Sequence, residues 1–425
     1  MKRLLYLLLI PVLLFTPVHA QEIIEDDDEY AAGASDTLRL DTLNAVSDTA
    51  SASVPSLPWP QSVQASLASL LDSHMFSTSQ VGMMVYDLDA DSVIFRHNER
   101  QRLRPASTMK LITAITAIDK LGGSYQFKTE LCYTGQVSDG VLRGNVYCVG
   151  GFDPRFNSDD LRAFVESIHK MGVDTIRGNL YADKTMKDTA RLGKGWCWDD
   201  DNPVLSPLLI SRKDNFMQRF ADELQKYGIV VEGTVSEAMK PGDAFCICRR
   251  FHTMDQILMN MMKESDNLYA ESMFYQIAAS TGNHPASARS ARAVINRLVT
   301  KVGLDPSQYY FADGSGLSLY NYVTAELQVK LLRYAFMNNN IYLHLHPSLP
   351  QAGVDGTLKN RMHGTFTRGN VYAKTGSVTG VSSLAGYCTA PNGHRLAFSI
   401  INQGVKRSRD ARAFQDHVCM VLCQP

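Results

Sequence analysis

The sequence lacks an excess of charge of either sign, because its 425 residues include 42 Lys and Arg against 43 Asp and Glu. Proteins that neutralise the phosphates of nucleic acids need a basic surface, so no nucleic-acid partner is expected. The chain also lacks a good membrane span. Its apolar run from Leu4 to Val18 is shorter than the roughly 20 residues that cross a bilayer. These absences leave a nearly neutral chain that has to be classified by its motifs.

Cysteine is scarce for a fold held together by disulfides, with 8 residues in the whole chain. Disulfide pairing cannot be deduced from spacing alone. Cys132 and Cys148 flank a turn-rich segment and could lie on adjacent strands. Cys246 and Cys248 are too close in sequence to pair easily with each other. Disulfides are compatible with an exported chain, and their pairing stays open.

Metal-binding patterns are missing as well. The sequence has no C-x-x-C pair, and His344 and His346 alone do not supply the ligand set of a zinc site. We therefore expect neither a metal nor another cofactor.

The first twenty residues indicate an exported protein. Lys2 and Arg3 precede the apolar run, and residues 18–20 (Val-His-Ala) give a small-residue cleavage pattern before Gln21. This layout predicts a secretory signal peptide over residues 1–20. The alternative is an uncleaved membrane anchor, and a lipoprotein is disfavoured because no cysteine follows the cleavage pattern. We expect a periplasmic or otherwise exported protein with no stable membrane span after cleavage.

Residues 21–58 have the composition of a disordered tether. An acidic run from Glu25 to Glu29 is followed by Ser, Thr, Ala and Asp with little apolar periodicity. Such a segment cannot bury enough apolar surface to offset the ordering of the chain. The acidic run could bind a basic partner or metal ions, but a solvated run of charge is the preferred interpretation. The rest, about 365 residues, suffices for two or three globular units.

A candidate nucleophile lies at the start of a predicted helix. Ser107 and Lys110 form an S-x-x-K motif, and the residues after it have the apolar spacing of one helix face. Pro105 suits the first turn of a helix, which places Lys110 one turn from Ser107 on the same side. A lysine whose pKa is lowered by burial or by a second cation can take the proton of a serine hydroxyl. The helix N-terminus would also favour an oxyanion.

The S-x-x-K spacing alone is weak support, because Ser167 and Lys170 repeat it. That second copy continues an ordinary amphipathic helix pattern from Leu161 and needs no chemical explanation. The copy at Ser107 is preferred because of two motifs downstream of it.

These two motifs follow in a fixed order. The S-D-N tripeptide at 265–267 interrupts two apolar helical stretches, so it is either a loop or, as we prefer, a helix N-cap. The K-T-G-S sequence at 374–377 ends a strand-like run. In a strand Lys374 and Thr375 point to opposite faces, and Gly376 lets a substrate backbone approach closely.

The three motifs in this order resemble the S-x-x-K, S-x-N and K-T-G sets that line one active site in the penicillin-recognising serine enzymes. Ser107 and Ser265 are 158 residues apart (265 minus 107), which is more than a simple β-lactamase architecture allows. The chain therefore resembles the class C low-molecular-mass penicillin-binding proteins. These are D-alanyl-D-alanine carboxypeptidases and endopeptidases with two extra domains inserted after the nucleophile helix. The resemblance runs from about Val81 to the C-terminus, with further matching phrases at 150–154, 196–200, 313–318, 349–358 and 380–387.

The resemblance implies an α+β fold. Its core would be like that of the serine β-lactamases and transpeptidases, an antiparallel sheet between helices, with two smaller inserted domains. The implied catalytic domain comprises residues 59–122 and 251–425, and the inserted region comprises residues 123–250. The residues themselves predict hairpins at 83–95 and 384–401 and a C-terminal helix at 407–422.

The resemblance also implies a role for each motif residue. Ser107 would attack the carbonyl of the penultimate D-Ala, with Lys110 as the general base for this attack and for the deacylating water. Ser265 would relay a proton to the leaving amine, and Asn267 would hold the substrate amide while orienting Lys110.

The K-T-G-S strand would complete the site. Lys374 would keep Lys110 partly neutral by like-charge repulsion and, with Thr375 and Ser377, would receive the terminal carboxylate. The backbone N–H groups of Ser107 and Ser377 would form the oxyanion hole.

Asp200 is a further candidate for binding substrate. In the resembling enzymes an acidic residue after a W-x-W pattern reaches the ammonium group of a diaminopimelate side chain. Asp199 and Asp201 compete for this role, and a solvated acidic turn is the alternative. Asp153 and Asp313 sit beside Gly or Pro, which favours turn and packing roles for them.

The implied enzyme is a serine D,D-peptidase acting on D-Ala-D-Ala termini or D-amino-acid cross-links of peptidoglycan stem peptides, with β-lactam antibiotics as covalent inhibitors. A β-lactamase is the rival enzyme, although the long insert favours the peptidase. A non-catalytic wall-binding protein is disfavoured because all the chemical positions are filled. The balance of carboxypeptidase and endopeptidase activity stays open, since both attack the same carbonyl.

Overall fold

The computed structural model describes residues 57–197, 202–364 and 366–424. The expected signal peptide, nearly all of the expected tether and Asp200 lie outside these ranges. Only the unit Leu57–Pro425 is considered below. No helix within the described ranges is long and apolar enough to cross a membrane.

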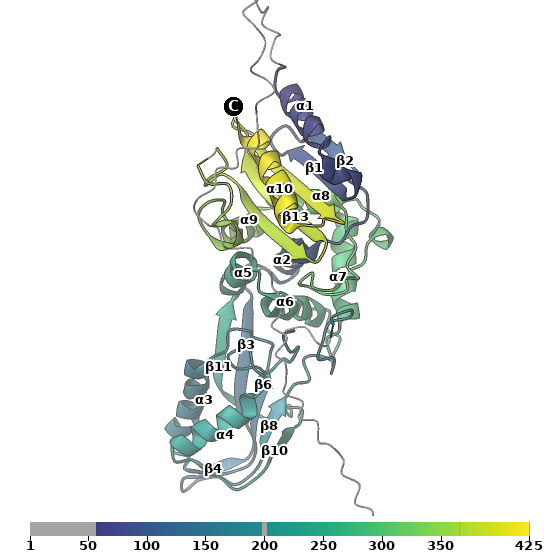
Figure 1. The fold of residues 1–425 in the computed structure, drawn as a ribbon. Helices are drawn as coiled ribbons and strands as arrows, with labels where there is room; N and C mark the ends of the chain where they lie inside the picture. The colour runs from purple at the N-terminus through teal and green to yellow at the C-terminus, as the bar shows by residue number, and fades with distance from the viewer. Residues whose placement is uncertain (1–56, 198–201, 365, 425) are drawn as a thin grey trace, which may run out of the picture. The chain divides into compact units, whose positions relative to one another are not determined.

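The two ends of this unit meet in one antiparallel sheet (Figure 1). In spatial order its strands are β12 (Tyr372–Val378), β13 (Val381–Thr389), β14 (Arg395–Gln403), β1 (Gln80–Asp87) and β2 (Ser92–His97). Strands β1 and β14 pair from Gln80 opposite Gln403 to Asp87 opposite Leu396. Both predicted hairpins are present, as β1–β2 and β13–β14.

Helices cover both faces of this sheet. Successive side chains of a strand point to opposite faces, so buried apolar residues of one strand can pack against helices on either side. Met83 and Val85 of β1 belong to a hydrophobic cluster on one face, and Met84 belongs to a second cluster. The first cluster includes α1 (Gln61–Leu70) and α10 (Ser408–Cys423), and the second includes α2 (Met109–Leu121) and α8 (Ala325–Phe336). Helix α10 confirms the predicted C-terminal helix.

The helix after Ser107 is buried on all sides, whereas the sequence predicted a single apolar face. Every residue of α2 from Met109 to Ile118 is buried, and α6 (Asn267–Ala279) is buried from Leu268 to Ala278. A helix enclosed all round lies inside a core. Helices α2 and α6 pack against each other in this core, which also contains α5 (Met254–Lys263), α7 (Ala288–Lys301) and α9 (Asn339–Ser348).

Residues 126–253 form two further sheets (Figure 1). The first contains β10 (Val235–Glu237), β8 (Leu180–Asp183), β6 (Val146–Gly150), β3 (Gln126–Tyr133) and β11 (Phe245–Thr253). The second contains β4 (Gln136–Ser138), β5 (Val141–Arg143), β7 (Thr175–Ile176) and β9 (Val230–Val231). One hydrophobic cluster joins both sheets to α3 (Ser158–Lys170) and α4 (Phe216–Lys226). The division of this region into two small domains stays a prediction.

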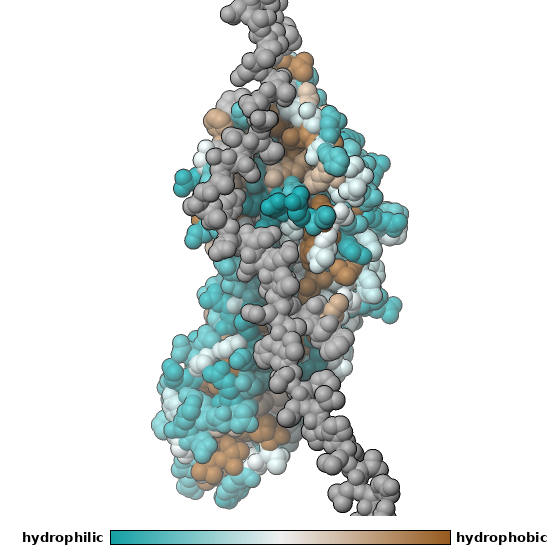
Figure 2. Space-filling model, viewed as in Figure 1, coloured by the Kyte–Doolittle hydropathy of each residue, from teal (hydrophilic) through white to brown (hydrophobic). Residues whose placement is uncertain are grey.

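The surface of these two sheets is mostly hydrophilic in the view of Figure 2, with small hydrophobic patches over β4 and β10. The exposed apolar side chains of this region include Val230 of β9 and Val235 of β10. Both strands lie at the edge of their sheets and are only two and three residues long. Short edge strands offer little backbone to a second chain, which limits unwanted pairing.

A disulfide joins Cys132 of β3 to Cys246 of β11. Cys132 and Cys148 do lie on adjacent strands, as expected, but Cys148 is a free, buried thiol. The register explains the difference. Cys148 lies opposite Leu131 and belongs to the hydrophobic cluster, whereas Cys132 lies opposite Cys246. Because neighbouring residues of a strand face opposite sides of the sheet, Cys132 and Cys148 point to opposite faces.

The second S-x-x-K motif is an ordinary part of α3, as predicted. Ser167 donates its hydroxyl to the carbonyl O of Phe164 in the same helix at 2.7 Å. Lys170 is exposed at the end of that helix. This serine is satisfied within its own helix and needs no chemical role.

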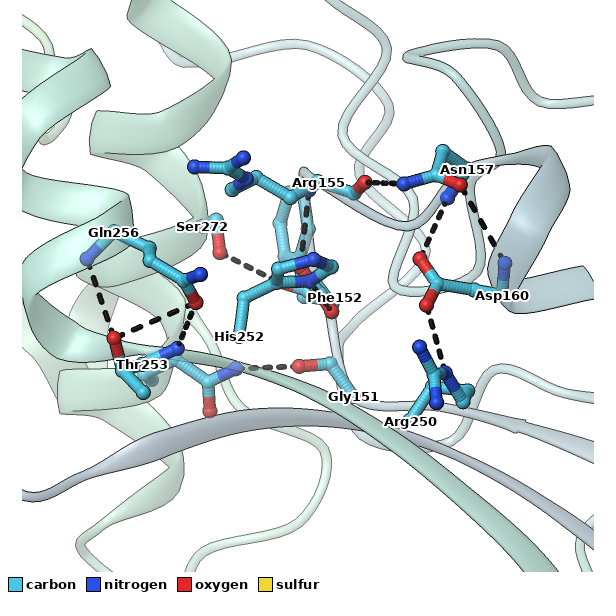
Figure 3. A network of polar contacts seen from close by, with 12 residues as sticks. Gly151, Phe152, Arg155, Asn157, Asp160, Arg250, His252, Thr253, Gln256 and Ser272 are labelled. Carbon is cyan, nitrogen blue, oxygen red and sulfur yellow. Dashed lines mark hydrogen bonds and ion pairs between the residues drawn. The ribbon is translucent and has the colours of Figure 1, made fainter. Parts of the chain in front are cut away.

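A polar network connects the loop after β6 to helix α6 (Figure 3). Ser272 of α6 donates a hydrogen bond to the carbonyl O of Phe152, and Gln276 donates one to the carbonyl O of Gly151. These bonds satisfy backbone groups that a buried loop cannot leave unpaired. The helix that begins at Asn267 is thereby fixed to the strands of the inserted region.

The same loop contains Asp153, which has the turn role that its neighbours predicted. Its Oδ1 atom accepts the backbone N–H of Arg155 at 3.0 Å, and its Oδ2 atom lies 2.7 Å from His252 Nδ1 on β11. Nearby, Arg250 Nε donates to Asp160 at 2.7 Å. These contacts hold the loop against β11 and α3.

Candidate active site

Ser107 lies in a tight turn immediately before α2. The 3₁₀ turn η2 (Ala106–Thr108) contains it, and Thr108 closes the turn by donating its hydroxyl to the carbonyl O of Pro105 at 2.7 Å. Ala106 has a φ of +46°, and a left-handed backbone costs a non-glycine residue about 1–3 kcal/mol. Such strain persists where the surrounding structure enforces it, and it clusters at functional sites. The Ser107 side chain remains partly exposed at this turn.

Lys110 is fully buried, and its Nζ atom has three hydrogen-bond partners. Ser107 Oγ lies at 3.0 Å, Asn267 Oδ1 at 2.8 Å and the carbonyl O of Ser315 at 2.9 Å. A neutral amine has two N–H groups and one lone pair. The oxygens of Asn267 and Ser315 only accept hydrogen bonds, so they take up both N–H groups. The lone pair then faces the hydroxyl of Ser107, as a general base requires.

Burial lowers the pKa of Lys110 from 10.5 to about 8. The carboxylates of Asp313, Glu271 and Asp266 act in the opposite direction and limit this shift. The pKa of Lys374 is also well below its ordinary value, first because of burial and then because of the charge of Lys110. Burial is therefore the leading cause of the lowered pKa of Lys110, and the expected effect of Lys374 on the pKa of Lys110 stays a prediction.

The S-D-N tripeptide lies between α5 and α6, and each of its residues has a separate task. Asp266 is the N-cap of α6 and accepts the backbone N–H of Leu268 at 2.9 Å, so the preferred cap interpretation is correct for this residue. It also forms an ion pair with Arg212 of the inserted region. Ser265 has a φ of +59°. Ser265 and Asn267 on either side of the cap each bind one of the two buried lysines.

Lys374 is the second fully buried lysine of the site. Its Nζ atom donates to Ser265 Oγ and to the carbonyl O of Thr375, each at 2.8 Å. Because the oxygen of Ser265 accepts this bond, its own hydroxyl hydrogen can be directed toward a bound substrate. Each serine of the site is therefore paired with a buried amine.

Strand β12 passes directly beside Ser107. A Cβ atom on Gly376 would lie 2.9 Å from Ser107 N and 2.8 Å from the carbonyl O of Pro105. Real Cβ atoms do not approach other atoms so closely, so this position requires glycine. On the same strand Thr375 donates its hydroxyl to Thr357 Oγ1 at 2.7 Å. The sequence predicted a glycine that admits substrate, and the structure adds the packing of β12 against Ser107.

The polar groups of the site are arranged by depth. The two lysines are completely buried, while the side chains of Ser107, Ser265, Asn267 and Thr375 are partly exposed and Ser377 is exposed. A substrate can therefore reach the hydroxyl and amide groups while solvent is kept from both amines. Low solvent access is also what keeps the pKa of each lysine depressed.

Two expected features stay predictions. Asp200 lies outside the described residues, although its neighbour Trp196 donates Nε1 to Asp313 Oδ2 at 2.8 Å. The oxyanion hole assigned to the backbone N–H groups of Ser107 and Ser377 is consistent with the closeness of β12 to Ser107.

Sequence reasoning missed Glu271, a buried carboxyl group in the second turn of α6. Its Oε1 atom accepts the backbone N–H groups of Gly314 at 3.0 Å and Ser315 at 2.8 Å. The available signal was a charged residue inside the otherwise uncharged helical run 268–278. Asp313 has its predicted turn role, because it accepts the backbone N–H of Gly316 at 2.9 Å.

The described residues contain one cluster with the spacing of a metal site, formed by Glu130, Cys132 and Cys246. The two cysteines are joined in the disulfide, and a disulfide sulfur is not the thiolate that binds metals. This cluster therefore does not support a metal site.

Comparison with known proteins extends these observations to most of the chain. The sequence matches the D-Ala-D-Ala carboxypeptidase 3 (S13) family over residues 63–208 and 211–424. It is 29% identical over 427 aligned positions to the D-alanyl-D-alanine carboxypeptidase of Actinomadura sp. (strain R39), covering 76% of this chain and 77% of the relative. It is 26% identical over 405 positions to the D-alanyl-D-alanine carboxypeptidase DacB of Haemophilus influenzae, covering 75% of this chain and 84% of the relative.

Solved structures agree with the fold. The crystal structure of penicillin binding protein 4 from Haemophilus influenzae aligns with a TM-score of 0.76 at 24% identity, covering 83% of this chain and 97% of that chain. A crystal structure of the same protein complexed with a β-lactam aligns with a TM-score of 0.70 at 25% identity over the same shares. The expected α+β fold with a transpeptidase-like core and additional sheets is confirmed.

Proposed function

Because the chain belongs to the D-Ala-D-Ala carboxypeptidase 3 (S13) family, we propose that the site around Ser107 carries out the acyl-transfer reaction of this family. The protein is a serine-type D-Ala-D-Ala carboxypeptidase and a penicillin-binding protein. The observation that supports the site assignment is the environment of Lys110, whose two acceptor partners leave its lone pair toward Ser107. Ser107 is then the nucleophile and Lys110 its general base.

In the acylation step Ser107 Oγ attacks the carbonyl carbon of the penultimate D-Ala, and Lys110 accepts the serine proton. The C–N bond to the terminal D-Ala then breaks, and the departing amine needs a proton. Ser265 donates its hydroxyl hydrogen to that amine and receives a replacement from the buried lysine pair through Lys374, which lies 2.8 Å away. The products are an ester on Ser107 and free D-Ala, and no net proton is gained or lost.

Substrate binding uses the exposed side of the site. The side-chain amide of Asn267 holds the substrate amide, while Thr375 and Ser377 receive the terminal carboxylate above the buried Lys374. The hydroxyl of Thr357, 2.7 Å from Thr375 Oγ1, adds a further polar group beside this carboxylate. Backbone N–H groups at the nucleophile and on β12 stabilise the oxyanion, which is where charge develops in the transition state.

Deacylation reverses the roles of the first step. Lys110 takes a proton from a water molecule, the water attacks the ester carbonyl, and the proton returns to Ser107 Oγ as the bond to it breaks. Carboxypeptidase and endopeptidase reactions share these steps and differ in the group that leaves first. The same site can therefore trim a D-Ala terminus or open a D-amino-acid cross-link.

The proposed setting is the periplasm, with peptidoglycan stem peptides as substrates. The disulfide between Cys132 and Cys246 suits an oxidising compartment, and the first twenty residues have the layout of a signal peptide. β-Lactam antibiotics are proposed as covalent inhibitors, in line with the β-lactam complex of the Haemophilus influenzae protein. Asp200 is proposed to contact the diaminopimelate side chain of the stem peptide.

Release of D-Ala from a stem pentapeptide tests this function. The purified protein is incubated with muropeptides, and the products are identified by mass spectrometry. The wild type is expected to remove the terminal D-Ala, and Ser107→Ala is expected to leave the pentapeptide intact. Ser167→Ala is the matched control, because it changes the serine of the second S-x-x-K motif. Equal activity of Ser107→Ala and wild type would contradict the proposal.

A further inference from the structure

The carbonyl O of Ser315 is one of the two acceptors that direct the lone pair of Lys110, at 2.9 Å from its Nζ atom. This carbonyl belongs to a turn that presses against the nucleophile. Gly316 has a φ of +88°, and a Cβ atom there would lie 1.9 Å from the carbonyl O of Ala106. A small displacement of this turn therefore changes the hydrogen bonding of the base.

Glu271 holds the turn from the side of α6. Its Oε1 atom accepts the backbone N–H groups of Gly314 and Ser315, and its side chain is buried, with the whole residue 1% exposed. Glu271 follows Asn267 by four residues, so both lie on the same face of the helix. This face binds Lys110 directly through Asn267 Oδ1 and holds the second acceptor, the carbonyl of Ser315, in place.

Resting on the proposed role of Lys110, we propose that Glu271 is a positioning residue of the acylation reaction. Its carboxyl group fixes the peptide of Gly314 and Ser315, so that the Ser315 carbonyl takes one N–H group of Lys110 and the lone pair is left for Ser107. A buried polar group is costly unless it is hydrogen-bonded, and Glu271 has the two backbone N–H groups and the side chain of Ser315 as partners.

The protonation state of Glu271 determines whether an uncharged or a charged side chain reproduces it best. Burial and the nearby Asp313 raise the pKa of Glu271 to about 8, so at neutral pH the carboxyl group is mostly protonated. A glutamine has the same shape, keeps an oxygen that accepts both backbone N–H groups and carries no charge. An aspartate keeps the carboxyl group but withdraws it by one methylene from Gly314 and Ser315.

The test compares the acylation of the full chain by a fluorescent penicillin in Glu271→Gln, Glu271→Asp and Glu271→Ala. The Asp and Ala variants are expected to lower the rate constant of acylation by about 10-fold to 100-fold, because a misplacement of about 1 Å costs up to that much. The non-covalent affinity for penicillin is expected to stay the same. Glu271→Gln is expected to recover most of the rate, because it keeps an uncharged side chain whose oxygen accepts both backbone N–H groups.

Ser272→Ala is the matched control. Ser272 is the next residue of the same helix, is equally buried, and donates to the carbonyl O of Phe152 in the inserted region. This variant is expected to keep the wild-type rate constant even where its melting temperature falls. If circular dichroism shows that Glu271→Ala is unfolded, the comparison of Glu271→Asp with Glu271→Gln tests the positioning role of Glu271 instead.

The outcomes separate this inference from the proposed function. Equal acylation rates for wild type, Glu271→Asp and Glu271→Gln would overturn the positioning role of Glu271. An equal loss in Ser272→Ala would also overturn it, because the cause would then be general damage to the helix. A wild-type protein that penicillin does not acylate would overturn the proposed function itself, and this inference with it.

Discussion

Lys374 donates a hydrogen bond from Nζ to Ser265 Oγ at 2.8 Å, just as Lys110 lies 3.0 Å from Ser107 Oγ. The site thus contains two serine–lysine pairs, and in each pair a partly exposed hydroxyl lies over a completely buried amine. Burial lowers the pKa of both amines, so each amine holds its proton less tightly than an exposed lysine does. In the proposed mechanism the first pair activates the nucleophile, and the second serves the leaving group.

Acylation by penicillin is expected to accelerate as the pH rises through about 8. The pKa of Lys110 is lowered from 10.5 to about 8, so below this pH most of the lysine carries a proton and cannot accept the one from Ser107. On the acid side the rate constant should therefore fall about tenfold for each pH unit. Stopped-flow measurement of acylation checks this. A rate that is constant from about pH 6 to about pH 10 would exclude Lys110 as the base.

Ser265→Ala is expected to slow the release of D-Ala by about 100-fold or more, because a positioned proton donor contributes about 10²-fold to 10⁴-fold. Ser265→Gly is the matched variant. It removes the same hydroxyl but tolerates the φ of +59° without strain, so it should be equally slow and at least as stable as Ser265→Ala. Turnover and melting temperature are measured for both. Normal turnover in the glycine variant would show that the hydroxyl has no chemical role.

Removal of the disulfide is expected to lower stability without changing the chemistry. The double variant Cys132→Ser, Cys246→Ser should lose about 2–4 kcal/mol of unfolding free energy, because the bond closes a long loop with a sequence separation of 114. Its acylation rate constant should match the wild type, since the bond joins strands of the inserted region. Cys148→Ala is the control and should still lose stability when a reductant is added. A double variant as stable as the wild type would contradict the structural role of this bond.

Removal of the hydroxyl of Thr375 is expected to weaken substrate binding more than it slows the attack by Ser107. Thr375→Val should raise the KM for the pentapeptide, because the terminal carboxylate loses a hydrogen-bond donor. The loss of substrate-binding free energy should be about 1.5–3 kcal/mol, the range for a hydrogen bond to a charged group. Steady-state kinetics with a pentapeptide amide provide the control, since an amidated terminus lacks the carboxylate. An equal effect on both substrates would contradict this role.

The sequence was sufficient where function depends on the identity of side chains. Ser107, Lys110, Ser265, Asn267 and Lys374 stood out because their motifs occur together in one order. In the structure Lys110 binds Ser107 and Asn267, and Lys374 binds Ser265. The cap role of the residue between Ser265 and Asn267 could also be predicted. A polar residue before an apolar helical run is a local signal, and the structure shows it at the start of α6.

The sequence was insufficient where function depends on the backbone or on distant contacts. Ser315 contributes its carbonyl oxygen, which every residue type has, so no side chain marks its role. Glu271 was visible as a charge in an apolar helix, but its partners Gly314 and Ser315 lie 43 and 44 residues away. The partner of Cys132 depended on strand register, since a shift of one residue would turn its side chain to the other face of the sheet.

The central claim is that Ser107 is the nucleophile, and the site of penicillin attachment tests it most directly. Wild type, Ser107→Ala and Ser167→Ala are each incubated with benzylpenicillin, digested, and analysed by mass spectrometry to locate the covalent adduct. We predict one penicillin per chain on the peptide that contains Ser107 in the wild type and in Ser167→Ala, and no adduct in Ser107→Ala. An adduct on any other residue of the wild type, or an undiminished adduct in Ser107→Ala, would contradict the claim.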